Sequence, residues 1–397
     1  MNEQAHTTRR IPPLVLAMIP LVLLGVLVAW FIKADPTMAL RPDVPPIEEL
    51  SIQRVILEPN LITLEIVNDG PDPVTVAQVM VDEAYWYHDI EPVGPIGRLG
   101  RATIKINYPW VKDEAHAVTL ISSTGVTFET EIAVAVESPR PTAELFGLFA
   151  LLGAYVGVIP VALGLLWLPA LRQTPKRWVD FFLFLTIGLL VFLGFDAIEE
   201  ALETIEKVPN VYQGVGLLVI GGLGSFALLT ALGNAMSSRG NAGSEPAVPL
   251  AYMIAVGIGL HNLGEGLAIG AAYALGEIAL GSMLVLGFML HNITEGLAIV
   301  APLARSGARI RHLVAMGMAA GLPTIIGMWI GGFTYSPVWA LLFLAIGSGA
   351  IFQVAWQILR QMARQRESAE ALLDFHNTAG LLAGFVLMYA TGLLVAV

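Results

Sequence analysis

Nine apolar runs, each long enough to cross a lipid bilayer, dominate this chain of 397 residues. A helix needs about 20 consecutive apolar residues to span the hydrocarbon core. Composition agrees, because 13% of the residues are charged, whereas soluble domains carry about 25%. The chain is therefore predicted to be a polytopic α-helical membrane protein. The runs cover residues 12–32, 143–171, 178–203, 211–236, 248–275, 277–304, 312–333, 336–359 and 371–397.

A polar segment of different character, residues 36–141, separates the first two runs. Apolar and polar residues alternate in it, as in LITLEIVND and VTVAQVMVD, and turn residues separate the stretches. Several short strands in about 100 residues predict a β-sandwich with an immunoglobulin-like fold. We therefore expect a cytoplasmic N-terminus and membrane anchor helix (1–35), an extracytoplasmic β-sandwich domain (36–141) and an eight-helix membrane domain (142–397).

Charge and cysteine content exclude several classes of protein. Residues 33–141 hold 8 basic and 17 acidic residues, so most of the net charge of −11 belongs to the β domain. Nucleic-acid binding would need a basic patch, which the sequence lacks. With no cysteine in the chain, disulfides, thiolate metal sites and cysteine nucleophiles are excluded.

The distribution of lysine and arginine predicts the orientation in the membrane. When nine spans are threaded, all five basic clusters fall on one side, and the opposite short loops hold only Lys207. The positive-inside rule then places the N-terminus in the cytoplasm, and the β domain and C-terminus outside the cytoplasmic (plasma) membrane. Run 12–32 exceeds the 7–15 residues of a signal h-region, so an uncleaved anchor is expected. The clusters are Arg9/Arg10, Arg172/Lys176/Arg177, Arg239, Arg305/Arg309/Arg311 and Arg360/Arg364/Arg366.

Two near-identical polar motifs interrupt neighbouring apolar runs: HNLGEGLAI at 261–269 and HNITEGLAI at 291–299. Residues four apart share one face of a helix, so His261 and Glu265 point the same way, as do His291 and Glu295. Both motifs lie near the middle of their spans, and two antiparallel helices bring them to the same depth. Ionisable side chains at this depth are costly and usually functional. The pair therefore predicts one shared site near the middle of the membrane.

Six side chains form this predicted site, because Asn262 and Asn292 lie beside the four ionisable groups. Imidazole and carboxylate without thiolate suit Zn²⁺, Fe²⁺ or Mn²⁺, whereas Mg²⁺ and Ca²⁺ prefer oxygen ligands alone. Zn²⁺ is the first expectation, and Fe²⁺ and Mn²⁺ fit the same ligands. The metal would be the substrate, with no organic cofactor. No P-loop occurs, so ATP is not expected to drive the process.

At these motifs the chain resembles the ZIP family of divalent metal transporters. That family has eight spans and H-N-x-P-E-G-type motifs in the fourth and fifth, where HNLGEG and HNITEG stand here. The resemblance covers about 143–397. It implies that the six motif residues are metal ligands, that metal moves into the cytoplasm, and that the protein forms a homodimer. The motif prolines of the family are Gly264 and Thr294 here.

An acidic segment in the second span of the core adds a predicted entrance for cations. DAIEEALE resembles the family's H-L-L-P-E-A segment, with Asp196 at the His position and Glu200 at the Glu position. Glu199 and Glu203 lie beside them near the outer end of the span. The alternative is an ordinary solvated acidic helix end. In the sixth and seventh spans, where the family has acidic residues, the chain offers Thr324, Gln353 and Gln357, so one principal metal site is expected rather than two.

Two other functions compete with transport. An intramembrane zinc-dependent hydrolase would use Glu265 or Glu295 as its general base and keep an open coordination position, but no H-E-x-x-H motif occurs. A metal sensor would bind the ion without moving it, and its β domain would signal to a partner. We expect a transporter and not an enzyme.

Overall fold

Alternating buried and exposed residues form the β domain, as its sequence pattern predicts. In the computed structural model, which describes residues 13–34, 47–239, 247–364, 372 and 374–393, eight strands form two antiparallel four-stranded sheets. The strands are β1 (Leu50–Glu58), β2 (Leu61–Asn68), β3 (Val76–Val81), β4 (Ala84–Trp86), β5 (His88–Glu91), β6 (Arg101–Ile106), β7 (His116–Ser122) and β8 (Thr127–Ile132).

The strand order identifies the type of sandwich. One sheet has the order β1-β2-β6-β5 and the other β4-β3-β7-β8, which is the ABED and C′CFG arrangement of immunoglobulin-like domains. Ile62, Leu64 and Ile104 from the first sheet and Val79 and Leu120 from the second are fully buried between them. The prediction of an immunoglobulin-like sandwich is confirmed.

A hydrogen-bond network around Asp82 ties β6 and β7 to the turn after β3. The Asp82 carboxylate accepts hydrogen bonds from Tyr108 Oη (2.7 Å), His116 Nδ1 (2.7 Å) and the Ala117 amide (2.9 Å). The Val111 amide donates to His116 Nε2 (3.2 Å), so both nitrogens of this buried ring are satisfied. Burial favours the protonated acid, but these hydrogen bonds outweigh it and lower the pKa of Asp82. The same contact raises the pKa of Tyr108 to about 12.

We expect the change Asp82→Asn to destabilise the β domain by about 1–2 kcal/mol, because the amide cannot accept all three hydrogen bonds. The pKa of Asp82 is lower in the folded protein than in the unfolded chain. The ionised carboxylate therefore stabilises the β domain fully at pH values above the unfolded-state pKa, and this stabilisation is lost as the pH falls through the folded-state pKa. Hydrogen exchange of β7 and β8 in the full-length protein, at neutral and acidic pH, measures both effects. Asp89→Asn is the control, because among the described residues this exposed carboxylate accepts a side-chain hydrogen bond from Tyr87 alone, which the amide oxygen can keep. Equal exchange of the two variants at neutral pH would contradict the prediction.

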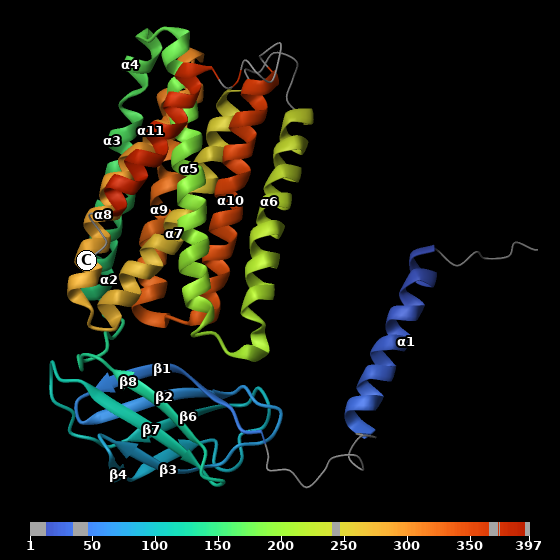
Figure 1. Ribbon diagram of the computed structural model, residues 1–397, viewed down its shortest axis with the longest axis vertical. Helices are drawn as coiled ribbons and strands as arrows, with labels where there is room; N and C mark the ends of the chain where they lie inside the picture. Colours follow the sequence, from blue (N-terminus) through green and yellow to red (C-terminus); the bar gives the residue numbers. More distant parts are fainter. Residues whose placement is uncertain (1–12, 35–46, 240–246, 365–371, 373, 394–397) are drawn as a thin grey trace, which may run out of the picture. The chain divides into compact units, whose positions relative to one another are not determined.

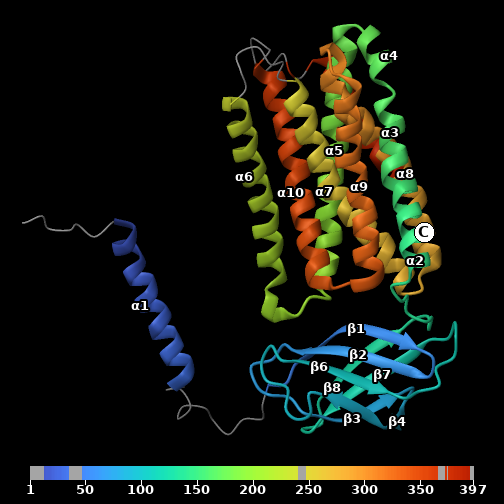
Figure 2. The same cartoon turned by 180° about the vertical axis from the view of Figure 1, so that it is seen from behind.

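The C-terminal part of the chain is a bundle of long apolar helices (Figures 1 and 2). Among the described residues, seven helical segments are long and apolar enough to cross a membrane. The elements are α2 (Ala143–Gly153), the π-helix η2 (Ala154–Val158), α3 (Ile159–Leu165), α4 (Leu168–Gln173), α5 (Lys176–Ile205), the 3₁₀-helix η3 (Asn210–Tyr212), α6 (Gly214–Arg239), α7 (Ala247–Ala274), α8 (Ile278–Val300), the 3₁₀-helix η4 (Ala301–Arg305), α9 (Ile310–Thr334), α10 (Pro337–Arg364) and α11 (Phe375–Gly392).

Seven of the eight predicted core spans correspond to these segments, and the first of them is the continuous run α2–η2–α3–α4. The eighth prediction, 371–397, contains α11, an 18-residue helix that is not among the seven and whose first turn carries the polar His376 and Asn377. The predicted polytopic helical bundle beside a separate β domain is therefore confirmed. The basic residues Arg9, Arg10 and Arg366 lie outside the described residues.

The predicted anchor is a helix described by itself, because residues 1–47 and 48–397 form two separate units. This helix, α1, covers Pro13–Ala34 and has 22 residues with Lys33 in its last turn. At 1.5 Å per residue it is about 33 Å long, which matches the hydrocarbon core of a bilayer.

Glycines allow the central helices α7 and α9 to touch along their backbones. A Cβ atom placed on Gly327 would lie 2.1 Å from the Leu263 carbonyl oxygen, and one on Gly266 would lie 2.1 Å from the Thr324 carbonyl oxygen. Small residues permit such close approach of helices in membranes. The backbone of the first motif is thereby positioned directly against α9.

Candidate functional site

The two repeated motifs meet at the contact between α7 and α8. Nε2 of His261 lies 3.1 Å from Oε1 of Glu265, and Nε2 of His291 lies 2.5 Å from the same oxygen. One potential ligand atom from each residue lies within 4.8 Å of the others, and all three side chains are buried. Two imidazoles and a carboxylate at this spacing match the ligands that proteins offer to Zn²⁺ and related ions.

The two asparagines connect the motifs crosswise. Asn262 Nδ2 donates a hydrogen bond to Glu295 Oε2 (3.0 Å), and Asn292 Nδ2 donates one to Glu265 Oε2 (3.1 Å). The amide of each motif therefore orients the carboxylate of the other. Groups that orient metal ligands in this way strongly affect metal affinity. Both asparagines are completely buried.

The same asparagines connect the site to two further helices. Asn262 Nδ2 also donates to the Ala320 carbonyl of α9, and Asn292 Nδ2 to the Val156 carbonyl of η2, both at 3.1 Å. In an α-helix the Val156 carbonyl would pair with the N–H of residue 160, which is a proline and has none. Asn292 supplies a donor instead. Single π-helical turns of this kind are frequent at functional sites.

Three oxygens around the cluster have no hydrogen-bond partner among the described residues. They are Oδ1 of Asn262, Oδ1 of Asn292 and Oε1 of Glu295, and all are buried. An unpaired polar atom in an apolar interior is unfavourable, and a cation would satisfy such oxygens. Glu295 itself lies outside the group of three within 4.8 Å. The donor set, two imidazoles with surplus oxygens, fits a divalent metal.

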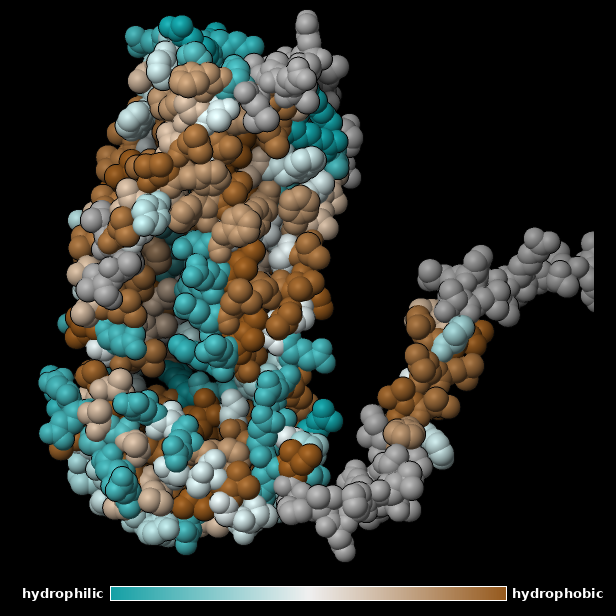
Figure 3. Space-filling model, viewed as in Figure 1, coloured by the Kyte–Doolittle hydropathy of each residue, from teal (hydrophilic) through white to brown (hydrophobic). Residues whose placement is uncertain are grey.

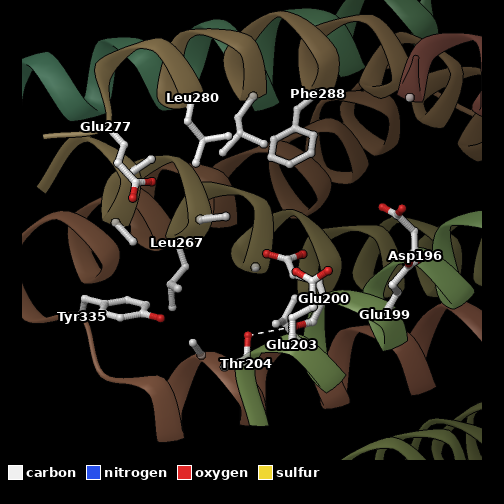
Figure 4. Close-up of a pocket in the computed structure, with 18 of the residues that line it drawn as sticks. Asp196, Glu199, Glu200, Glu203, Thr204, Leu267, Glu277, Leu280, Phe288 and Tyr335 are labelled. Carbon is white, nitrogen blue, oxygen red and sulfur yellow. Dashed lines mark hydrogen bonds between the residues drawn. The ribbon is translucent and has the colours of Figure 1, made fainter. Parts of the chain in front are cut away.

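An acidic cavity of about 600 Å³ leads to this cluster and reaches His291. Figure 3 shows a hydrophilic strip and hollow in the otherwise apolar surface of the bundle. In Figure 4 the labelled acidic residues of α5 lie across the cavity from Glu277 and Tyr335. All four acidic residues predicted from the second span line it: Asp196, Glu199, Glu200 and Glu203.

Sequence reasoning missed Glu277, which lines the same cavity from the turn between α7 and α8. The available signal was a single carboxylate between two apolar runs. It also missed the Val156 and Ala320 carbonyls, which accept hydrogen bonds from the asparagines, because the type of a residue does not indicate what its backbone carbonyl contacts.

Apolar side chains fill the bundle on the other side of the cluster. Ile254 and Ile258 of α7, Leu303 of η4 and Ile351 of α10 are completely buried there in one continuous core. The cluster therefore adjoins the acidic cavity on one side and a closed apolar layer on the other.

Comparison with known proteins shows that the C-terminal part of the bundle is similar to a known family. Residues 234–392, from the end of α6 through α11, match the family model described as ZIP zinc transporter. This part of the bundle is therefore similar to ZIP zinc transporters. The human protein named zinc transporter ZIP4 is 29% identical over 144 residues, which are 35% of this chain and 22% of the human protein. The match covers about a fifth of that relative's length.

This match confirms the resemblance to the ZIP family expected from the motifs, since the matched region contains both of them. The chain is an integral membrane protein with long apolar helices. The β domain lies outside the matched residues.

Proposed function

We propose that this protein, like the family its core resembles, carries divalent metal cations across the membrane into the cytoplasm, with Zn²⁺ as its first substrate and Fe²⁺ or Mn²⁺ as alternatives. One observation carries the proposal: the buried cluster of His261, Glu265 and His291 lies at the end of an acidic cavity. A binding site closed to water on one side and open to a charged cavity on the other suits an ion that must be captured and dehydrated.

The geometry suggests an order of events. Five carboxylates in the cavity raise the local concentration of cations. At the cluster, the ion would exchange water for imidazole and carboxylate ligands, while Glu295, Asn262 and Asn292 supply adjoining oxygens. Release on the other side requires the apolar layer around Ile258 to separate, so transport needs a change in helix packing.

The orientation predicted from the basic residues completes this proposal. The N-terminus would be cytoplasmic, the β domain and the C-terminus extracytoplasmic, and the acidic cavity would open outward. The protein would act as a homodimer, as the family resemblance implies, without ATP or an organic cofactor.

The test is uptake of Zn²⁺, Fe²⁺ and Mn²⁺, each measured separately, into liposomes that contain the purified full-length protein. We expect saturable uptake that His261→Ala abolishes, because this change removes one of the three clustered ligands. The matched control is His376→Ala, at the start of α11, which should retain wild-type uptake. Equal uptake by wild type and His261→Ala would refute the proposal.

The same assay separates the two competing functions. A metal sensor would bind Zn²⁺ tightly without moving it into the liposomes. An intramembrane hydrolase would cleave a peptide or ester in a zinc-dependent manner and lose this activity in Glu265→Gln.

A further inference from the structure

Three turns of the helical bundle border the acidic cavity, and each contributes a residue that lines it. Lys207 lies in the α5–α6 turn, Glu277 in the α7–α8 turn and Tyr335 in the α9–α10 turn. Figure 4 shows Glu277 and Tyr335 on sides of the cavity that face the acidic residues of α5. The width of the cavity therefore depends on where these three turns are held.

The β domain binds the first of these turns through two carboxylates. Asp69 accepts hydrogen bonds from the backbone amides of Asn210 (2.5 Å) and Val211 (2.7 Å). Glu49 accepts one from Asn210 Nδ2 (2.8 Å). Hydrogen bonds to a charged acceptor are about twice as strong as neutral ones.

Asp69 belongs to a rigid part of the β domain. Its own amide donates to the Glu49 carbonyl at 2.9 Å. The preceding residue, Asn68, is completely buried, and its side chain donates to the carbonyls of Asp72 and Ile96 at 2.7 Å. The carboxylate of Asp69 is thus presented to the helices from a fixed turn.

The β domain also contacts the other two turns. Arg54 Nη2 donates a hydrogen bond to the Phe333 carbonyl (3.0 Å), two residues before Tyr335. A Cβ atom on Gly276 would lie 2.9 Å from Cγ2 of Val136, so the α7–α8 turn approaches the end of the β domain closely. Gly276 has a φ of +79°, a conformation that favours glycine, and Glu277 follows it directly.

A second cavity of about 570 Å³ lies between the β domain and the bundle, and Tyr335 lines both cavities. Its β-domain wall carries Arg54, Arg101 and Glu65, whereas the first cavity carries five carboxylates and Lys207. A cation is therefore attracted more strongly to the first cavity than to the second. The charge of the cavity lining thus changes near Tyr335, which lies between the two cavities.

We propose that the β domain is a positioning element for metal capture: through Asp69, Arg54 and Val136 it holds the three turns that shape the acidic cavity. The inference rests on the proposed function for its effect on uptake, but the contact itself is testable without transport. Asp69 and Arg54 act through the turns and do not touch the metal.

The contact is tested first, in membranes, by cross-linking. The chain has no native cysteine, so the pair Asp69→Cys/Val211→Cys can be bridged by a short thiol-specific reagent without background. The control pair is Gln78→Cys/Val211→Cys, because Gln78 is exposed on β3 of the other sheet. We expect efficient cross-linking of the first pair alone. Equal yields for the two pairs would overturn the proposal.

The effect on capture is tested next with Arg54→Ala/Asp69→Ala, against Arg98→Ala/Glu129→Ala at exposed positions of the same domain. We expect the first variant to raise the KM for uptake about tenfold, the low end of what electrostatic focusing contributes. Its kcat, and its equilibrium affinity for Zn²⁺ in detergent, should stay unchanged, which also shows that it is folded. If Asp69→Cys/Val211→Cys cross-links but Arg54→Ala/Asp69→Ala keeps the wild-type KM, the positioning role is overturned. If Asp69→Cys/Val211→Cys cross-links but the wild-type protein moves no metal, the proposed function alone is refuted.

Discussion

Replacing Glu265 by glutamine should lower the affinity for Zn²⁺ at least about 100-fold, whereas the same change at Glu295 should lower it only about tenfold, the scale of groups that orient a ligand. The two glutamates occupy equivalent places in HNLGEG and HNITEG. Their surroundings differ, and this difference is the basis of the prediction.

Glu265 is the centre of the cluster. Its Oε1 contacts Nε2 of both His261 and His291, and its Oε2 accepts a hydrogen bond from Asn292. Glutamine would remove the negative charge and would place an amide group beside either the two imidazoles or the Asn292 donor. Both orientations leave a polar group mismatched in a buried site.

Glu295 has a different set of contacts. Its Oε2 accepts a hydrogen bond from Asn262, and its Oε1 has no partner among the residues that the structure describes. A glutamine there can keep its oxygen toward Asn262, so the three-residue cluster is left intact.

The measurement is equilibrium Zn²⁺ binding to the detergent-solubilised protein by competition with a chelating dye, with the metal content counted per chain. One tightly bound ion is expected in the wild type. Equal losses of affinity in the two variants would make Glu295 a full ligand. Two tightly bound ions that both vanish in Glu295→Ala would refute the single-site hypothesis.

Much of the architecture follows from one-dimensional patterns. Apolar run length predicted the spans because the bilayer sets the length of a crossing helix, and alternation predicted the strands because successive side chains point to opposite faces. The spacing of His261 and His291 from the ends of their runs predicted that they meet. The structure brings their imidazoles to one oxygen of Glu265.

Features that depend on contacts between distant segments were not predictable. The twin motifs suggested a symmetrical set of six ligands, but in the described part of the chain three of these residues lie within mutual ligand distance. The partner of Asn292 on η2 is a backbone carbonyl 136 positions away. The contact of Asp69 with the α5–α6 turn likewise joins residues more than 140 positions apart, and no local pattern indicates it.

The contact of Gly327 is a further feature that the sequence does not predict. Substitution of this residue has the second large expected effect. In the sequence GLPTIIGMWIGG it resembles any small residue of a membrane helix. In the structure, however, a Cβ atom there would lie 2.1 Å from the Leu263 carbonyl oxygen and 2.8 Å from the Leu267 amide nitrogen. Both atoms belong to the backbone of α7, on either side of Glu265.

We therefore expect Gly327→Ala to destabilise the protein by about 3 kcal/mol, the upper end of the usual cost of overpacking, and to weaken Zn²⁺ binding with it. A flexible side chain would move aside, but a helix backbone moves only as a unit. Separation of α9 from α7 would displace the turn that carries His261 and Glu265, and would break the hydrogen bond from Asn262 to the Ala320 carbonyl.

The matched control is Gly224→Ala on α6, where a Cβ atom would have no neighbour within 4 Å. This change should leave stability unchanged or raise it by up to about 1 kcal/mol, because alanine favours the helix. Thermal unfolding of the two variants in the same detergent, with and without Zn²⁺, decides the matter. If Gly327→Ala unfolds at the same temperature as Gly224→Ala and binds Zn²⁺ equally well, the backbone contact between α7 and α9 does not position the metal cluster.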